Sequence, residues 1–306
     1  MEGDAGMSAI APGNVAVITG SAGGIGLALA REAARRGMRV VLSDVREKAL
    51  HEAARALSGE GADVIAVAAD VTSDADVQAL AAKAVEHFGR VNLLVNNAGA
   101  FVASLAWETP EAQLDWVIDL NFRSVARGIR AFVPRMIAQG DACHVVTVAS
   151  AAGITVYPGY ATYAPTKHAA VALSEALYLD LIAEGIDTIG VTIAMPGVIR
   201  TDIMVPEKTS PAALGLSRDA RHANRTVRAM ERVMIGGVDA AMPADAMATR
   251  VLDAVANGDL YTLPNHDDAR CVGVATAIGA GRAAGTNPWR PIVESILQSM
   301  AKADTR

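Results

Sequence analysis

The sequence predicts an α/β protein, a single doubly wound domain in which helices flank a central parallel sheet of about seven strands. Three observations predict this class. Short apolar runs without alternation, typical of strands buried on both faces, recur from residue 15 to residue 194 with helical segments between them. The first run leads directly into a glycine-rich turn and then a helix. No linker, internal repeat or low-complexity insert divides the chain, so we expect one domain over residues 14–265.

Composition excludes several classes of protein. The 306 residues are 52% hydrophobic and 4% aromatic, so Ala, Val, Leu and Ile must build the core. A net charge of −6 without a dense basic cluster argues against nucleic acid as a partner. No apolar run reaches the ~18–20 residues of a membrane span, and residues 1–13 read as a flexible tail without signal-peptide character. Two cysteines far apart in sequence indicate reduced thiols and a cytoplasmic protein. The six histidines show no metal-ligand spacing, so no metal is expected.

The first predicted strand, residues 15–19, runs into the glycine-rich turn at residues 20–26 and a helix that ends near residue 36. Gly20, Gly24 and Gly26 allow a tight turn and a close approach of the backbone to a pyrophosphate, while the helix N-terminus supplies N–H groups and a positive dipole end. This strand–turn–helix unit predicts a Rossmann-type dinucleotide site.

Asp44 ends the second predicted strand, residues 38–44. An acid at this point can accept hydrogen bonds from both adenosine ribose hydroxyls and repel a 2′-phosphate. The positions from which a base would attract that phosphate hold Gly23 and Val45, and we expect Arg46 to be solvated. The predicted cofactor is NAD, and NADP is disfavoured.

The alternation continues with a helix at residues 47–57 and a strand at residues 63–69, after which Asp70 has two open interpretations. It can meet the adenine edge, or it can cap the next helix, residues 74–88, with Thr72 and Asp74. The fourth strand, residues 91–95, leads into residues 96–99, where small residues allow close approach to the cofactor. The paired amides Asn96 and Asn97 are expected to join neighbouring strands.

A long helix is predicted from Thr109 to Gln139, with Thr109 as N-cap, Pro110 at the first helical position and a bend near Pro134. Gly140 is expected to end it. Asn121 lies inside this helix at a cost in propensity, which indicates either a wet helix face or a chemical role.

The fifth strand, residues 143–149, is followed by Ser150 and, thirteen residues later, by Tyr163. Tyr163 and Lys167 share one helix face. A neighbouring ammonium lowers the pKa of a phenol from its usual value near 10, which would make Tyr163 a proton donor and acceptor. Pro165 is acceptable only in a first helical turn, so Tyr163 should lie at the helix mouth.

With these motifs the chain resembles the short-chain dehydrogenase/reductase family, in its single-domain branch. The matching residues are Thr19-Gly20-x-x-x-Gly24-Ile25-Gly26, Asn96 to Gly99, Asn121, Ser150, Tyr163-x-x-x-Lys167 and Pro196-Gly197-x-x-x-Thr201. The resemblance covers residues 14–203 continuously and extends loosely to residue 263.

The resemblance implies the catalytic roles. Tyr163 would be the general acid/base and Ser150 would bind the substrate oxygen. Lys167 would lower the pKa of Tyr163 and hold the nicotinamide ribose, and Asn121 would hold a water linking Lys167 to solvent. The implied cofactor contacts are Gly20, Ser21, Gly24, Ile25, Gly26, Asp44, Asp70, Val71, Asn97, Ala98, Gly99, Tyr163, Lys167, Pro196, Gly197, Ile199 and Thr201.

Residues 202–242 are expected to close over the substrate. Their methionines favour a bulky apolar ligand, although they can equally be core residues. Their arginines form either a solvated helix face or a site for a carboxylate-bearing substrate such as an acyl thioester. The extension at 266–306 departs from the family's usual short ending, and we expect it to pack on the same domain. A homodimer or homotetramer is predicted, with a primary interface on helices at about 110–139 and 160–184, as the resemblance implies.

The sequence therefore predicts an NAD(H)-dependent oxidoreductase that interconverts a secondary alcohol and its ketone, with an aryl, cyclic or terpenoid-like substrate. Two alternatives stay open: an NADP-dependent ketone or 3-oxoacyl reductase, and a non-catalytic dinucleotide-binding regulatory protein.

Overall fold

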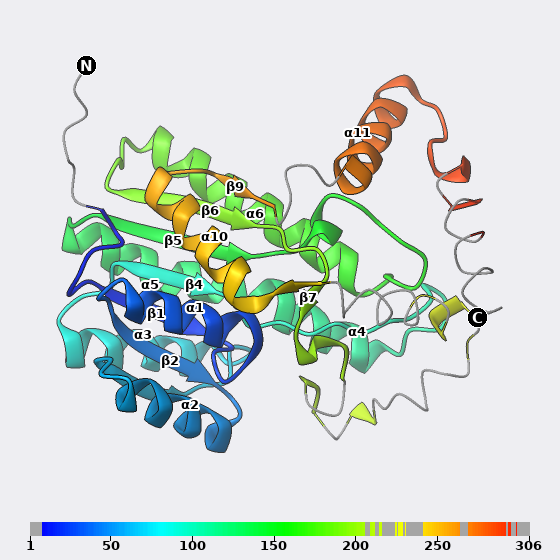
Figure 1. The fold of residues 1–306 in the computed structure, drawn as a ribbon. Coiled ribbons are helices and arrows are strands. Elements are labelled where there is room, and N and C mark those ends of the chain that lie inside the picture. Colours follow the sequence, from blue (N-terminus) through cyan, green and yellow to red (C-terminus); the bar gives the residue numbers. More distant parts are fainter. Residues whose placement is uncertain are drawn as a thin grey trace.

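A computed structural model of the chain describes residues 8–205, 241–263 and 269–291, together with 209–211, 214–215, 224, 226–228, 230, 293–294 and 298. Its centre is a seven-stranded parallel sheet with the order β3-β2-β1-β4-β5-β6-β9 (Figure 1). The strands are β1 (Val15–Thr19), β2 (Arg39–Asp44), β3 (Val64–Ala68), β4 (Leu93–Asn96), β5 (Cys143–Val148), β6 (Ile189–Ala194) and β9 (Tyr261–Thr262). The predicted fold class is confirmed.

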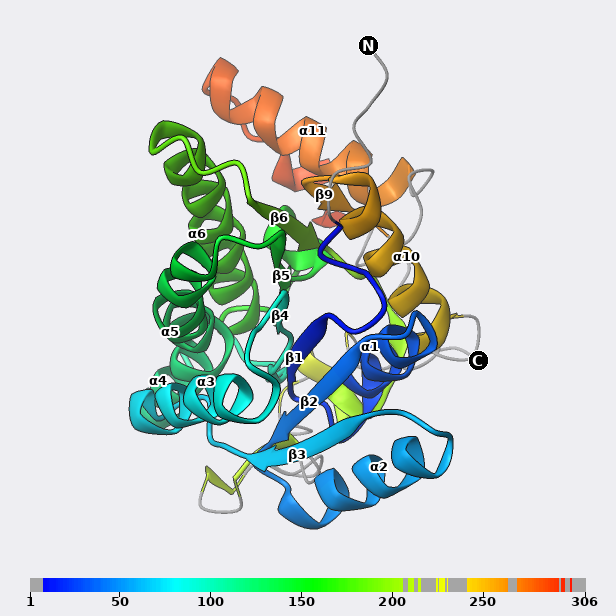
Figure 2. The ribbon, with the colours of Figure 1, turned by 90° about the vertical axis from the view of Figure 1, so that its left-hand side faces the viewer.

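Helices cover both faces of this sheet, as Figure 2 shows. One layer contains α1 (Gly24–Arg35), α2 (Glu47–Gly59) and α10 (Ala244–Asn257). The other contains α3 (Asp74–Phe88), α4 (Glu111–Ile118), α5 (Ser124–Gln139) and α6 (Tyr163–Ala183). Separate apolar clusters fill the two sides, with Leu29 and Leu252 in one and Phe132 and Leu181 in the other. The inner strands β1, β2, β4, β5 and β6 are almost entirely buried, which is why their sequences do not alternate, whereas the edge strands β3 and β9 are partly exposed.

Shorter elements lie around the carboxyl edge of the sheet. They are η2 (Ala151–Gly153), η3 (Asp202–Met204) and the paired strands β7 (Ile199–Arg200) and β8 (Met242–Pro243). The helix α11 (Ala269–Ala284) lies beyond the β9 edge of the sheet, outside both layers (Figures 1 and 2). No helix in the described ranges is long and apolar enough to cross a membrane.

The predicted helix at residues 109–139 is interrupted. It begins at Glu111 with Pro110 as N-cap, whereas the Thr109 hydroxyl donates to the Leu105 carbonyl and does not cap it. A π-helical turn, η1 (Asp119–Arg123), then separates α4 from α5. The helical register therefore breaks around Asn121; Pro134 lies inside α5, and the bend expected there stays a prediction. Gly140 ends α5 in the left-handed conformation, as predicted.

The predicted substrate-closing segment at 202–242 falls largely outside the described residues. Parts of the extension at 266–306 also lie outside them. The division into a tail, a catalytic domain and an extension stays a prediction.

Candidate active site

The glycine loop lies where the strand order reverses, between β1 and β4. Gly20 and Gly24 have left-handed φ angles of 65° and 55°, as a tight turn requires. A Cβ on Gly26 would lie 2.3 Å from the Gly20 carbonyl oxygen, so only glycine fits there. Among the described residues no side chain caps the N-terminus of the twelve-residue helix α1. The loop therefore has the form of a phosphate cradle at a switch point, where open α/β sheets bind ligands.

Thr19 and Asn97 join β1 to β4 across this point. The Asn97 amide donates to the carbonyl oxygens of Thr19 at 2.8 Å and Gly20 at 3.1 Å, and Thr19 Oγ1 accepts from the Asn97 N–H at 3.0 Å. The expected role of the paired amides is thus confirmed for Asn97 only. Asn96 Nδ2 is buried without a hydrogen-bond partner, and the Asn96 side chain packs against Gly128 of α5.

Asp44 lies beside the glycine loop, where the sequence predicted it, but its carboxylate is already engaged. Oδ1 accepts from Arg46 N at 2.9 Å and Nε at 3.0 Å, and Oδ2 accepts from Arg46 Nη2 and the Ala22 N–H. Burial alone would raise the pKa of Asp44, but these donors and the Arg46 charge lower it. The prediction that Arg46 is solvated holds in part: its side chain is 43% exposed, but its guanidinium also pairs with Asp44.

Several residues predicted to contact the cofactor are buried and act as supports. The Ser21 hydroxyl accepts from Ser43 N–H at 2.8 Å and donates to the Ser43 carbonyl, which fixes the glycine loop to β2. Val71 and Ile199 belong to the apolar core clusters. Arg127 of α5 donates to the Val71 carbonyl.

Asp70 adopts the turn of a helix start without capping it directly. Its Oδ1 accepts from the Thr72 N–H and hydroxyl, and its own N–H donates to Asp76. The N-cap of α3 is Ser73, whose hydroxyl accepts from the Asp76 N–H. The prediction that Asp70 caps this helix with Thr72 and Asp74 is therefore wrong in its residues, because Ser73 and Asp76 form the cap. Contact of Asp70 with an adenine stays a prediction.

Ser150 and Tyr163 meet at the carboxyl end of β5. Tyr163 is the first residue of α6, as the position of Pro165 predicted. Ser150 lies two residues beyond β5, where its hydroxyl accepts from the Ala152 N–H at 3.1 Å. Burial raises the pKa of Tyr163 to about 12, and a hydrogen bond with Ser150 offsets part of this rise. The expected direction, a lowered pKa, is wrong for the protein groups alone, because burial outweighs the other contributions.

Lys167 lies one turn below Tyr163 and is 4% exposed. Its Nζ donates to the Val148 carbonyl at 3.0 Å and stands 5.7 Å from the centre of the Tyr163 ring. Burial lowers the pKa of Lys167 to about 8. Burial therefore favours the neutral amine of Lys167 over the ammonium ion.

Asn121 is buried on the π-helical turn η1 and bonds the backbone that follows β4. Its Oδ1 accepts from the Ala100 N–H at 2.9 Å, while Nδ2 donates to the Ala100 carbonyl at 3.0 Å and to Thr166 Oγ1 at 3.3 Å. A Cβ on Gly99 would lie 3.1 Å from Asn121 Oδ1 and 3.4 Å from Lys167 Nζ. The absence of a side chain at Gly99 thus lets both side chains approach the backbone that follows β4. The burial of Asn121 excludes the alternative that it lies on a solvent-exposed helix face.

An aromatic cluster surrounds Tyr163. The Phe101 ring makes edge contacts with Tyr160 at 5.1 Å and Tyr163 at 5.0 Å, and Tyr157 contacts Tyr160 at 5.5 Å. Val227 and Met230 are buried in the same cluster. Tyr157 and Tyr160 lie just before the catalytic helix, a place from which the sequence allows them to shape the pocket, whereas no motif pointed to Phe101. The run of small residues before Phe101 could have indicated it, since this run follows β4 at the same edge of the sheet.

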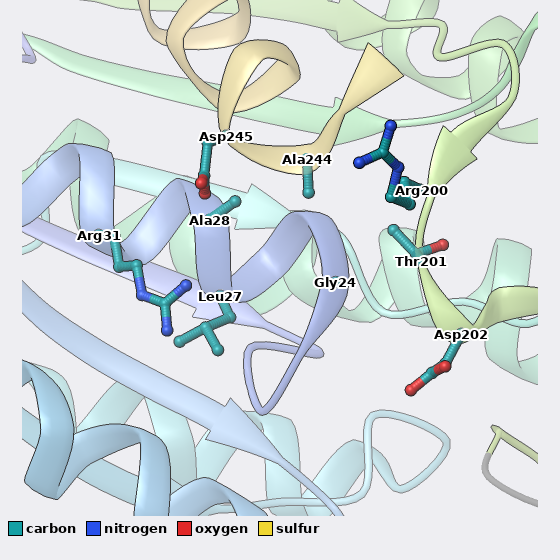
Figure 3. Close-up of a pocket in the computed structure, with 9 residues that line it drawn as sticks. All are labelled: Gly24, Leu27, Ala28, Arg31, Arg200, Thr201, Asp202, Ala244 and Asp245. Carbon is teal, nitrogen blue, oxygen red and sulfur yellow. The ribbon is translucent and has the colours of Figure 1, made fainter. Parts of the chain in front are cut away.

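The segment after β6 completes the site. The Pro196 carbonyl accepts from the Ala151 N–H at 2.8 Å, which fixes it to the Ser150 loop. Thr201 caps η3 by accepting from the Ile203 N–H, and its methyl group lies opposite Gly24. A pocket of about 520 Å³ adjoins this contact, between α1, α10 and residues 200–202 (Figure 3). No group of metal-ligating side chains occurs within the described part of the chain.

Three comparisons with known proteins agree with this architecture. The sequence model of the short chain dehydrogenase family matches residues 14–212. A CLA biosynthesis dehydrogenase/reductase from Lactiplantibacillus plantarum is 32% identical over 249 residues, 81% of this chain and 87% of that protein. A 1-deoxy-11-beta-hydroxypentalenate dehydrogenase from Streptomyces exfoliatus is 39% identical over 202 residues, 65% of this chain and 72% of that enzyme.

Among solved structures, a short-chain dehydrogenase/reductase from Burkholderia phymatum in complex with NAD has a TM-score of 0.85 and 35% identity, and the match covers 92% of this chain and 98% of that one. Sheet, glycine loop and sequence thus define an oxidoreductase of the dinucleotide-binding α/β class. The chain belongs to the short-chain dehydrogenase/reductase family.

Proposed function

We propose that this protein interconverts a secondary alcohol and its ketone with NAD(H) as cofactor. The observation that carries the proposal is the meeting of Ser150, Tyr163 and Lys167 beside the glycine loop. In this proposal Tyr163 Oη takes the proton of the alcohol or returns it to the ketone oxygen. Ser150 orients that oxygen and stabilises its developing charge. The nicotinamide, when bound, accepts or supplies the hydride.

The site fits a dinucleotide because the left-handed glycines and the uncapped N-terminus of α1 can receive a pyrophosphate. Asp44 at the end of β2 supports NAD over NADP, and the NAD complex of the Burkholderia relative supports the same choice. Gly20, Gly24, Ile25, Gly26, Asn97, Ala98, Gly197 and Thr201 are the proposed cofactor contacts around this loop. Ser21, Val71 and Ile199 stay proposed contacts as well, and their burial also helps to hold the elements around the loop.

Lys167 would hold the nicotinamide ribose and favour the phenolate of Tyr163 through its charge. The ammonium is close to the phenol ring, and desolvation strengthens its field there. Asn121 fixes the backbone at Ala100 and the α6 residue Thr166. Its proposed part in a water link from Lys167 to solvent rests on this location.

A bulky apolar substrate is proposed from the cluster around Tyr163. Only 4% of the chain is aromatic, yet four rings gather at this point. Aromatic rings contribute large contact areas for flat or cyclic ligands. The name of the Streptomyces relative, a hydroxypentalenate dehydrogenase, also supports an alcohol as substrate.

Replacing Tyr163 with Phe tests the mechanism. Tyr163→Phe keeps the buried ring but removes the proton-transferring hydroxyl, so we expect turnover to fall by about 10²–10⁴-fold. NADH affinity, measured by fluorescence titration, should stay within about twofold. A panel of aryl and cyclic ketones and secondary alcohols supplies the substrates.

Tyr261→Phe is the matched control, since that hydroxyl bonds Glu175 on the surface, away from the site, and its turnover should equal that of the wild type. Full activity of Tyr163→Phe would contradict the mechanism. Tight NADH binding by the wild type without turnover of any substrate would favour the regulatory alternative.

We also propose a homodimer through α5 and α6, with a homotetramer as the alternative. Ile137, Leu179 and Ile182 are 44%, 62% and 59% exposed on these helices, an unusual exposure for large apolar side chains. Size-exclusion chromatography with light scattering tests this assembly. A cytoplasmic location stays a prediction.

A further inference from the structure

The Asp44 carboxylate has no acceptor site to spare. A carboxylate offers about four lone-pair positions, and Asp44 receives four hydrogen bonds: three from Arg46 and one from Ala22. Two of them come from the guanidinium, Nε to Oδ1 and Nη2 to Oδ2, each at 3.0 Å. This two-point, planar contact is the strongest form of the arginine–carboxylate pair.

The backbone donors hold fixed positions, whereas the guanidinium can move. The Arg46 side chain is 43% exposed and that of Asp44 is 5% exposed. A ribose that reaches Asp44 with two hydroxyls must therefore take the two positions held by Nε and Nη2. The exchange replaces two hydrogen bonds from a cationic donor with two from neutral hydroxyls, and this weakens the net gain from binding the ribose.

Arg46 also lies over the glycine loop. A Cβ on Gly23 would be 3.8 Å from Arg46 Nη2. The hydrogen bonds to Asp44 raise the pKa of Arg46, burial opposes this rise, and Asp202 in η3 adds a smaller increase. The cation is thus held beside the loop by acids on two different elements, and it remains available to an anion that arrives at Asp44.

We propose that Arg46 is a cofactor-specificity residue, which competes with the adenosine ribose for Asp44 and offers a cation to a 2′-phosphate. With Arg46 present, the preference of the chain for NAD over NADP is then weaker than the preference that Asp44 alone would give. The inference rests on the proposed dinucleotide site but not on turnover.

The test is a fluorescence titration of NADH and NADPH with the wild type and Arg46→Ala. The quantity of interest is the ratio of the dissociation constant of NADPH to that of NADH, because general attraction to the pyrophosphate cancels in it. We expect Arg46→Ala to raise this ratio by about tenfold, the effect of one good charged contact. NADH itself should bind more tightly, since Asp44 keeps only its two backbone donors.

Lys48→Ala is the matched control, because Lys48 is an exposed cation on the first turn of α2 and is not among the donors from which Asp44 accepts hydrogen bonds in the described structure. Its ratio should stay within about twofold of the wild type. Arg46→Lys keeps the charge without the planar fork and should raise the ratio less than Arg46→Ala. It also provides an answer if Arg46→Ala does not fold.

A ratio for Arg46→Ala that stays the same or falls would overturn the proposal, as would weaker binding of NADH. Binding of neither cofactor to the wild type would instead defeat the proposed function. Loss of turnover in Tyr163→Phe with an unchanged Arg46→Ala ratio would leave that function standing and remove only the role of Arg46.

Discussion

Asp44 and Tyr163 lie at two places along the same sheet edge, and their surroundings shift the pKa values of the two side chains in opposite directions. Asp44 is buried but surrounded by donors, and the Arg46 guanidinium reaches it from a half-exposed position. Its pKa is therefore lowered in spite of burial. Tyr163 and Lys167 are buried among aromatic and aliphatic side chains, with Ser150 and the Val148 carbonyl as their polar partners.

Burial consequently dominates at the Tyr163 site. It raises the pKa of Tyr163 to about 12 and lowers that of Lys167 to about 8, so both groups are pushed toward their neutral forms. The difference indicates two uses of one edge: paired charges suit recognition of a polar cofactor group, whereas desolvated groups suit proton transfer.

The largest expected effect comes from removing the buried charge. Lys167→Met should lower turnover by about 10²–10⁴-fold, because the phenolate of Tyr163 loses its counter-ion and the ribose its partner. The thermal midpoint should not fall, since a buried ammonium is costly and an apolar side chain of similar length replaces it. Steady-state kinetics and calorimetry measure the two quantities.

Lys83→Met, an exposed cation on α3, is the control and should change neither quantity. A large fall in thermal midpoint for Lys167→Met would show that the charge stabilises the fold, and the contrast between the two sites would then fail.

An intermediate effect is expected in the pH dependence of stability. Burial lowers the pKa of Lys167 to about 8 in the folded protein, below the ordinary lysine value of 10.5. Between these values the unfolded chain binds more protons, so the free energy of unfolding rises with pH, by at most about 1.4 kcal/mol per unit. Below pH 8 both states are protonated and the lysine contributes no slope.

Urea unfolding of the wild type and Lys167→Met from pH 7.5 to 9.5 isolates this contribution as a difference. A difference that does not change over this window would mean that Lys167 keeps an ordinary pKa.

The smallest effect is expected for the stability of Arg46→Ala. The Arg46 side chain is 43% exposed, so its ion pair with Asp44 is screened by solvent and should change the free energy of unfolding by less than about 1 kcal/mol. Urea unfolding at neutral pH measures it. A fall of several kcal/mol in the free energy of unfolding would show that the Asp44–Arg46 pair stabilises the fold. The contrast with the Tyr163 site would then fail.

Patterns with a strong local cause were predictable from sequence. The parallel sheet followed from apolar runs, and the start of α6 at Tyr163 followed from Pro165, because a proline ring is excluded from later turns. The order of strands then brought Ser150, Tyr163 and Lys167 to one edge.

Features that depend on side-chain conformation or on contacts between distant parts of the chain were not predictable from the sequence. An arginine two residues past an acid can point away from it or fold back onto it, and spacing alone does not reveal the two-point pairing of Arg46 with Asp44. The π-helical turn at Asn121 likewise depends on the backbone of Ala100, which lies far from it in sequence. The pKa of Tyr163 depends on how many apolar neighbours surround it, and spacing alone carries no such information.

The strand order also constrains how the chain assembles during synthesis. β1 pairs with β2 on one side and with β4 on the other, where Ala16 faces Leu93 and Ile18 faces Val95. At about 5–20 residues per second, several seconds separate the emergence of these partners from the ribosome. Throughout that time one edge of β1 is unpaired and apolar, which is the form of strand that aggregates most readily. The nascent chain is therefore most vulnerable before its fourth strand arrives, and each later strand adds at a single growing edge.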